Sequence, residues 1–305
     1  MDRFDALKLF IQIVERGSFT EAAQVLGMPR ATATHTIKEL EKRLGARLLE
    51  RTTRQVRPTL DGQAFHERSK RVLAELEDAE ASLSTHIADP RGSLRLDLHG
   101  AHATMVILPR IGEFHDRYPH IDVVLSSGDR LVDLVGEGID CVVRAGHPRD
   151  STLVARKLAD LPEIICASPD YLARHGVPRH PRDLAQHRGI GFFSRGNPNQ
   201  YPFTLMVDGQ ATQCAANGWL SVSDAECYTG AALAGCGLIQ VPRFRLEEHL
   251  KTGRLVQVLA QWPCPDLPVC ALYPFHRQLS PRVRVFIDWV GSLYAERFGA
   301  GIAPV

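Results

Sequence analysis

Long uncharged runs are missing from this chain of 305 residues. The longest stretch without Asp, Glu, Lys or Arg is the 16 residues between Glu226 and Arg243, and glycine and proline interrupt it. A membrane-spanning helix needs about 20 apolar residues, so this run is too short. Charged residues among the first ten positions also exclude a secretory signal there. We therefore expect a cytoplasmic protein with no membrane partner.

Cysteine is absent from the first 140 residues, and the seven cysteines that follow include no Cys-x-x-Cys pair. The 13 histidines have no metal-ligand spacing. The chain also lacks a His-Glu-x-x-His motif, a phosphate loop and a Gly-x-Ser-x-Gly elbow, and Gly235-Cys236-Gly237 lacks the third glycine of a dinucleotide fingerprint. We therefore predict no metal site, no catalytic residue and no cofactor.

An excess of one charge is also lacking, because 36 Lys and Arg residues stand against 35 Asp and Glu residues, a net charge of +1. Evenly spread, this balance would argue against a nucleic-acid partner. However, Arg30–Arg57 holds eight basic and three acidic residues, a local net charge of +5, and Gln63–Pro90 holds three basic and six acidic residues. This distribution favours a DNA-binding segment near the N-terminus.

The first 45 residues predict three helices. Apolar residues recur at helical spacing over Phe4–Val14, and Gly17 ends that helix. Ser18 and Glu21 match a capping box, which begins a short second helix. A third helix starts near Pro29. Its apolar face recurs at intervals of four, three and four residues: Ala33, Ile37, Leu40 and Leu44.

The opposite face of the third helix carries short hydroxyls and cations, which suit base edges and phosphates in a major groove. Its residues are Arg30, Thr32, Thr34, His35 and Lys38. Three helices with a glycine turn before the third indicate a helix-turn-helix, and a generic helical bundle is the alternative. The following segment alternates arginines with β-branched and apolar residues, which predicts a two-stranded wing that contains Arg51 and Arg54.

A long helix should follow from Leu60 to about Ile87, capped by Thr59. At 1.5 Å per residue it would be roughly 40 Å long, more than one small domain needs. Its apolar positions follow a heptad seam: Phe65, Ser69, Val72, Leu76, Ala79, Leu83 and His86. A second copy of the same helix is the natural partner for this seam.

Beyond a short hinge at 89–92, strands and helices alternate. Strands are expected at 94–98, 121–125 and 140–144, with helices at 104–117 and 131–135 between them. This rhythm indicates a parallel sheet covered by helices. A second set of strands begins at 163–168. Two α/β units with a crevice between them are a common arrangement for binding small molecules.

The chain resembles the LysR-type transcriptional regulators over nearly its whole length. The matching positions near the N-terminus are Phe10, Gly17-Ser18-Phe19, Ala22-Ala23, Leu26, Ile37, Leu40-Glu41, Leu44-Gly45, Leu48-Leu49, Arg51, Thr59 and Gly62. Those beyond the hinge are Leu108-Pro109, Phe114, Tyr118-Pro119, Asp133-Leu134, Gly138-Ile139-Asp140, Ala167-Ser168-Pro169, Tyr171-Leu172, Gly237-Leu238 and Pro242.

This resemblance implies an α+β multidomain chain with three parts. A winged helix-turn-helix would span 1–59, a dimerising linker helix 60–89, and a periplasmic-binding-protein-like α/β effector domain 90–298. Of its two subdomains, the first would comprise about 92–162 and 267–294, and the second about 163–266. Dimers formed through the linker helix would pair again through the effector domains into homotetramers.

The resemblance also implies the site residues. Those expected to contact DNA are Ser18, Pro29, Arg30, Thr32, Thr34, His35, Lys38, Arg51 and Arg54. Those expected to line the effector crevice are Gly100, Ala101, His102, Thr104, Ser126, Ser127, Arg144, Phe193, Ser194, Ser223 and Asp224. Helix starts and hydroxyls there would suit an anion, with His102 and Arg144 adding positive charge. The family often has Ser-Gln where this chain has Pro29-Arg30, and Arg in place of His35, so the operator sequence should differ.

The expected function is therefore sequence-specific binding of double-stranded DNA, tuned by a small-molecule effector, with RNA polymerase as a further candidate partner. The effector would shift a pre-existing equilibrium that sets the spacing of the DNA-binding heads. The alternative is a small-molecule-binding protein or an enzyme on the periplasmic-binding-like fold, without a DNA function. That alternative fits the chain from Leu94 onward but leaves the basic N-terminal segment unexplained.

Overall fold

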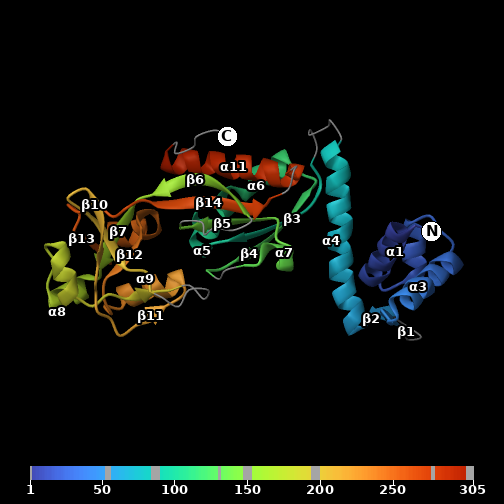
Figure 1. The fold of residues 1–305 in the computed structure, drawn as a ribbon, viewed down its shortest axis with the longest axis horizontal. Coiled ribbons are helices and arrows are strands. Elements are labelled where there is room, and N and C mark those ends of the chain that lie inside the picture. Colours follow the sequence, from blue (N-terminus) through green and yellow to red (C-terminus); the bar gives the residue numbers. More distant parts are fainter. Residues whose placement is uncertain are drawn as a thin grey trace. The chain divides into compact units, whose positions relative to one another are not determined.

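The computed structural model describes residues 2–51, 56–83, 90–129, 132–146, 153–193, 200–275 and 279–299. The chain divides into two compact units, Met1–Ala88 and Asp89–Val305, which are described separately (Figure 1). No helix among the described residues is long and apolar enough to cross a membrane.

The first unit begins with the three predicted helices, α1 (Arg3–Arg16), α2 (Phe19–Val25) and α3 (Arg30–Leu44). Gly17 ends α1 in the left-handed conformation, with φ of 63°, which glycine adopts without strain. The Ser18 hydroxyl then accepts a hydrogen bond from the Glu21 N–H and begins α2. This is half of the predicted capping box, since the described contacts include no hydrogen bond from the Ser18 N–H to the Glu21 carboxylate.

The predicted wing is present as β1 (Leu49–Arg51) paired antiparallel with β2 (Val56–Pro58). One carboxylate fixes its position, because Glu41 Oε1 accepts from the Leu48 N–H at 2.8 Å and from the Leu49 N–H at 3.1 Å. The wing is therefore tied to the C-terminal half of α3.

The linker helix α4 spans Leu60–Leu83 among the described residues. Its first half packs on the unit's own core: the Phe65 and Phe10 ring centroids lie 5.5 Å apart, and Ser69 is 2% exposed. Phe65 and Ser69 were expected in a seam between two copies, but here they are covered by the same chain. Val72, the next position of the predicted seam, remains 45% exposed.

The second unit is built around a five-stranded sheet in the order β4-β3-β5-β14-β6. Its strands are β3 (Gly92–Leu98), β4 (Ile121–Ser127), β5 (Cys141–Ala145), β6 (Leu153–Leu161) and β14 (Leu267–Pro274). β3 pairs parallel with β4 and β5, as the sequence predicts. β14 runs antiparallel to both β5 and β6, so the sheet is mixed. We call this sheet and its helices the first subdomain.

Helices of the first subdomain cover this sheet. They are α5 (Gly100–His102), α6 (Ile111–Arg117), α7 (Leu134–Glu137) and α11 (Pro281–Phe298), and Figure 1 shows α11 running along β6. The continuous helix expected at 104–117 is instead a π-helical turn at Ala103–Ile107, a 3-10 turn at Leu108–Arg110 and then α6. Pro109 lacks a backbone N–H, so the regular ladder breaks at the 3-10 turn.

The second subdomain contains a sheet in the order β12-β7-β13, and β7 (Glu163–Ala167) pairs antiparallel with both neighbours. The remaining strands are β8 (Gly191–Phe192), β9 (Phe203–Val207), β10 (Gln210–Cys214), β11 (Ser221–Val222), β12 (Ile239–Pro242) and β13 (Val256–Val258). The helices are α8 (Pro169–His175), α9 (Ala225–Leu233) and α10 (Glu247–Lys251), with 3-10 turns at Pro181–Gln186 and Arg243–Leu246. The chain crosses between subdomains after β6 and again before β14.

Candidate DNA interface and effector site

The recognition helix α3 separates an apolar face from a polar face. Ala33 and Ile37 are fully buried against α1 and α2. Arg30, Thr32, His35 and Lys38 are exposed, and Thr34 is half-buried. This separation follows from the 3.6-residue period, which places the buried residues on one side of the helix.

Five of the outward residues line one shallow hollow, which we call the recognition surface: Arg30, Ala31, Thr34, His35 and Lys38. Within the described part of the chain, the side chains of Arg30, His35 and Lys38 make no hydrogen bond or ion pair. Their donors are therefore free to contact a ligand with phosphate and base acceptors.

Four further residues were expected at the DNA. Ser18 is half-buried and its hydroxyl caps α2, while Pro29 is the exposed N-cap of α3. The backbone of Arg51 belongs to β1, but its side chain lies outside what the structure describes. Arg54 lies outside the described residues altogether.

The predicted effector residues of the first subdomain gather near the C-terminal ends of β3, β4 and β5. Gly100, Ala101 and His102 form α5, and the Thr104 hydroxyl donates to the Gly100 carbonyl at 3.0 Å. Ser127 is exposed at the end of β4.

His102 is 3% exposed, with Nδ1 2.6 Å from the Tyr294 hydroxyl and its ring packed on Phe244. Burial lowers the pKa of His102 to about 3, and the charges of Arg245 and Arg144 act in the same direction. His102 is therefore neutral at physiological pH. It does not add the positive charge that the sequence reading assigned to it.

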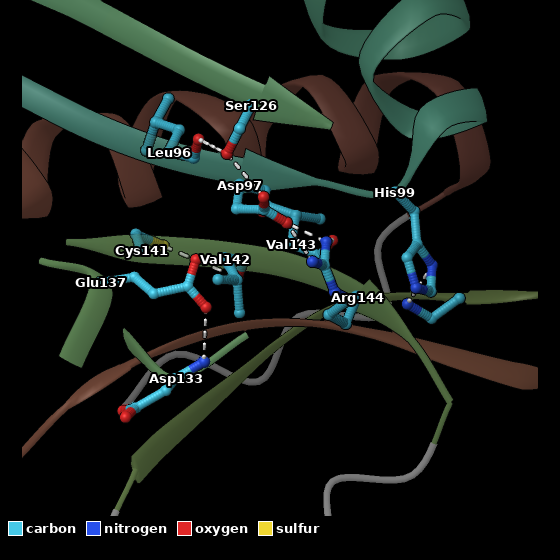
Figure 2. Close-up of polar contacts among 11 residues, drawn as sticks. Leu96, Asp97, His99, Ser126, Asp133, Glu137, Cys141, Val142, Val143 and Arg144 are labelled. Atoms are coloured by element: carbon cyan, nitrogen blue, oxygen red, sulfur yellow. Dashed lines mark hydrogen bonds and ion pairs between the residues drawn. The ribbon is translucent and has the colours of Figure 1, made fainter. Parts of the chain in front are cut away.

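Arg144 lies in a buried polar chain (Figure 2). Its guanidinium forms an ion pair with Asp97, which is 2% exposed and also accepts from the Ser126 hydroxyl at 2.5 Å. The guanidinium donates to the carbonyls of Asp97 and Val143 as well, each at 3.3 Å. The positive charge of Arg144 is thus balanced inside its own subdomain.

The second subdomain contributes the start of α9. Asp224 is its N-cap and accepts from the Cys227 N–H at 2.8 Å, which holds the pKa of Asp224 below its usual range. Ser223 is half-buried beside it, and the Phe193 N–H donates to the Val222 carbonyl. Ser194 lies outside the described residues.

Three residues that the sequence reading missed complete this region. The Asp129 carboxylate reaches across from the first subdomain and accepts from the Ala225 N–H at 2.8 Å. Arg245, in the 3-10 turn after β12, donates to the Ala225 carbonyl at 2.8 Å. His99 Nδ1 accepts from the Ala145 N–H at 3.3 Å, and burial, followed by Arg144, His102 and Arg245, holds its pKa well below the usual range.

We call this region the junction: Asp97, His99, His102, Asp129 and Arg144 on one side, and Asp224, Ala225 and Arg245 on the other. A separate hollow of about 120 Å³ lies behind the same 3-10 turn, between Phe244 and Phe298. Ligand pockets usually measure about 300 Å³ or more, so this hollow is small for an effector. No group of three or more His, Cys, Asp or Glu side chains placed to hold a metal occurs among the described residues.

Comparison with known proteins decides the family. Residues 4–63 match the model of the bacterial regulatory helix-turn-helix proteins of the LysR family. Residues 88–295 match the LysR substrate binding domain. The chain belongs to the LysR family. It is a helix-turn-helix transcriptional regulator with a DNA-binding domain and an effector-binding domain, as the sequence pattern predicts.

Relatives of this LysR-family regulator match over nearly their full length. An HTH-type transcriptional repressor of Pseudomonas aeruginosa (strain UCBPP-PA14) is 37% identical over 100% of this chain and 96% of its own. The HTH-type transcriptional activator AaeR of Escherichia coli (strain K12) is 30% identical over 99% of both chains. The family thus includes both repressors and activators.

Solved structures agree with the fold. That of CrgA, a LysR-type transcriptional regulator from Neisseria meningitidis, has a TM-score of 0.57 and 32% identity, covering 95% of this chain and 98% of its own. The full-length structure of the Vibrio cholerae virulence activator AphB has a TM-score of 0.56 and 29% identity, with the same coverage. The α+β architecture is therefore that of a full-length LysR regulator: winged helix-turn-helix, linker helix and two-subdomain effector domain.

Proposed function

We propose that this regulator reads its operator with the N-terminal half of α3. This proposal rests on the recognition surface. It presents the cations of Arg30 and Lys38, the His35 ring and the Thr34 hydroxyl, and no described residue bonds to these groups. Arg30 and His35 are the base-reading residues, since a guanidinium or an imidazole matches acceptors at base edges. Thr32, Thr34, Lys38 and the wing arginines Arg51 and Arg54 contact the phosphates, with Ser18 and Pro29 beside them.

Fluorescence anisotropy with the full-length protein tests this assignment, using duplex DNA from the region upstream of its own gene and a random duplex. Arg30→Ala should lose about 10-fold to 100-fold in affinity for the specific duplex and less for the random one. Lys38→Ala should weaken both duplexes by the same factor and reduce the salt slope by about 1.

Lys251→Ala is the matched control, because it removes an exposed cation from the other unit and should leave binding unchanged. Absence of binding to any duplex at low salt would overturn the proposed function. Equal losses for Arg30→Ala on both duplexes would remove its role in base reading.

Oligomerisation through α4 is the second part of the proposal. In this proposal the dimer seam begins at Val72, because Ser69 is buried and Phe65 packs on the core of the same chain. Dimers then pair through their effector domains into tetramers, which place several heads on one DNA. Light scattering should show smaller species for Val72→Glu, whereas the control Gln63→Glu, exposed nearer the start of α4, should assemble as the wild type does.

Regulation by a small molecule at the junction is the third part. The junction combines residues from both subdomains, so a ligand there binds two bodies that are joined by two chain crossings. The protein acts by binding and not by catalysis, in the bacterial cytoplasm where its DNA and RNA polymerase are. A thermal-shift screen of metabolites, followed by DNA binding with each hit, identifies the effector. Hits that never alter DNA binding would contradict this part.

A further inference from the structure

Asp129 links the two subdomains through a helix end. It follows β4 of the first subdomain, and its Oδ2 accepts from the N–H of Ala225, the first residue of α9 in the second subdomain. The local N-cap, Asp224, satisfies a different donor of the same helix, the Cys227 N–H at 2.8 Å. The start of α9 therefore carries one carboxylate of its own and one brought from the other subdomain.

Two arginines, Arg245 and Arg144, act on the Asp129 carboxylate through their charges, while its hydrogen bond is with the Ala225 N–H. The Arg245 side chain is only 10% exposed and is held by the Ala225 carbonyl, with Glu226 3.6 Å away. Burial raises the pKa of Asp129, the Ala225 N–H lowers it, Asp224 raises it, and the charges of Arg245 and Arg144 lower it. A backbone N–H at a helix start, with positive charge nearby, is a favourable partner for a bound carboxylate ligand.

The local charge balance decides how an anion enters. Arg144 is paired with Asp97, and Arg245 lies 3.6 Å from Glu226. Asp129 and Asp224 add two further negative charges nearby, while burial keeps His99 and His102 neutral. An added anion would increase this negative excess. An anion that takes the place of the Asp129 carboxylate leaves the balance unchanged and inherits the Ala225 N–H.

We propose that Asp129 is a built-in competitor of the effector: its carboxylate occupies the position that a carboxylate group of a small organic acid takes when it binds. This rests on the junction being the effector site. Displacement frees Asp129 from α9 and so removes a contact between the subdomains, which couples occupancy of the junction to their relative movement. A neutral or cationic compound has no such exchange available.

The test removes the Asp129 carboxylate by substitution and supplies acetate in solution to take its place. In full-length Asp129→Ala, acetate should raise Tm by at least about 2 °C over sodium chloride at equal ionic strength, because a ligand that binds only the folded state stabilises it. Acetamide, the neutral isostere, should have no such effect. The wild type should gain less than half as much from acetate, since Asp129 already fills the position.

Hydrogen exchange gives a second readout, in which the reversal by acetate is the effect that a merely structural role would not produce. Amides in the first turn of α9 should exchange several-fold faster in Asp129→Ala than in the wild type, and acetate should slow them again. Asp129→Asn keeps an acceptor for the Ala225 N–H and should show little rescue by acetate. Asp129→Ser, which is too short to reach α9, repeats the test if the alanine variant folds poorly.

Asp122→Ala is the matched control, because it removes an exposed carboxylate from β4, the strand that precedes Asp129. Equal acetate effects in this control, the wild type and Asp129→Ala would overturn the proposal, as would rescue by acetamide. These measurements contain no DNA, so their failure leaves DNA binding by α3 intact. Conversely, failure of the wild type to bind DNA would overturn the proposed function without changing the acetate result.

Discussion

Arg30, His35 and Lys38 of α3 have no polar partner among the described residues, whereas the polar side chains of the junction are bonded within the effector domain. Arg30, His35 and Lys38 are exposed and pair with no residue that the structure describes. Asp97, in contrast, is 2% exposed and bonded to both Ser126 and Arg144. The recognition surface can bind a ligand without breaking internal contacts. A ligand at the junction must replace hydrogen bonds that the protein already makes there. Its affinity is therefore lower, but its binding changes the contacts between the subdomains.

The largest effect on stability should come from the junction. Asp97→Ala leaves Arg144 buried without its carboxylate, and breaking such a pair costs about 3 kcal/mol of unfolding free energy or more. Urea denaturation should therefore show a lower midpoint for the second unit. Ser126→Ala, which removes only a donor to Asp97, is the milder control. Equal, small decreases of the urea midpoint for Asp97→Ala and Ser126→Ala would mean that the Asp97–Arg144 ion pair contributes little to stability.

A pH effect of intermediate size should arise from Glu163, in the second subdomain. Burial raises its pKa from 4.5 to about 7, and the bond from the Gln240 amide lowers it. The folded state thus holds this proton more tightly than the unfolded state, so stability falls as pH rises from about 4.5 through 7. Glu163→Gln should flatten the Tm-against-pH curve and raise stability at pH 8 by about 2 kcal/mol, somewhat less than the full pKa shift implies. If the slope of Tm against pH in Glu163→Gln equals that of the wild type, the raised pKa of Glu163 is contradicted.

A smaller loss is expected from Ser18, whose side chain alone has an internal partner among the predicted DNA residues with described side chains. Its hydroxyl accepts from the Glu21 N–H at 3.3 Å. Ser18→Ala should destabilise the DNA-binding unit by about 1 kcal/mol, and Ser18→Asp should recover most of that loss because aspartate also caps helices. Thermal denaturation measures the loss. A drop in DNA affinity of folded Ser18→Ala would place Ser18 at the DNA as well.

The smallest change in stability belongs to the recognition surface. His35 is exposed and has no described partner, so His35→Ala should alter the unfolding free energy by less than about 0.5 kcal/mol while weakening DNA binding. Paired denaturation and anisotropy measurements on one preparation check both. A large loss of stability for His35→Ala would break the contrast between the two regions.

Sequence reasoning performed best where the signals are local. Gly17, Ser18 and Pro29 mark helix ends within a few residues, and the period of α3 separates its two faces, so the head was predicted in detail. The junction depends on contacts between distant residues. Nothing beside Asp129 in the sequence indicates that its carboxylate meets Ala225.

The same limit applies to charge. Arg144 and His102 looked like cations for an anionic ligand, but Asp97 balances Arg144, and burial keeps His102 neutral. Arg245 was missed because it lies in a short 3-10 turn with no periodic pattern around it. Burial and pairing across the fold decide a side chain's charge, and neither is visible in local sequence.

The place of β14 also bears on how the chain folds during synthesis. β3 to β6 leave the ribosome early, but the strand that lies between β5 and β6 is made only near the end of the chain. The second subdomain therefore emerges, and has time to fold, before β14 completes the sheet of the first subdomain. The DNA-binding unit needs no such late segment. A nascent chain can thus carry a finished DNA-binding head before its effector domain exists, and the last strand made is the one that closes the first sheet.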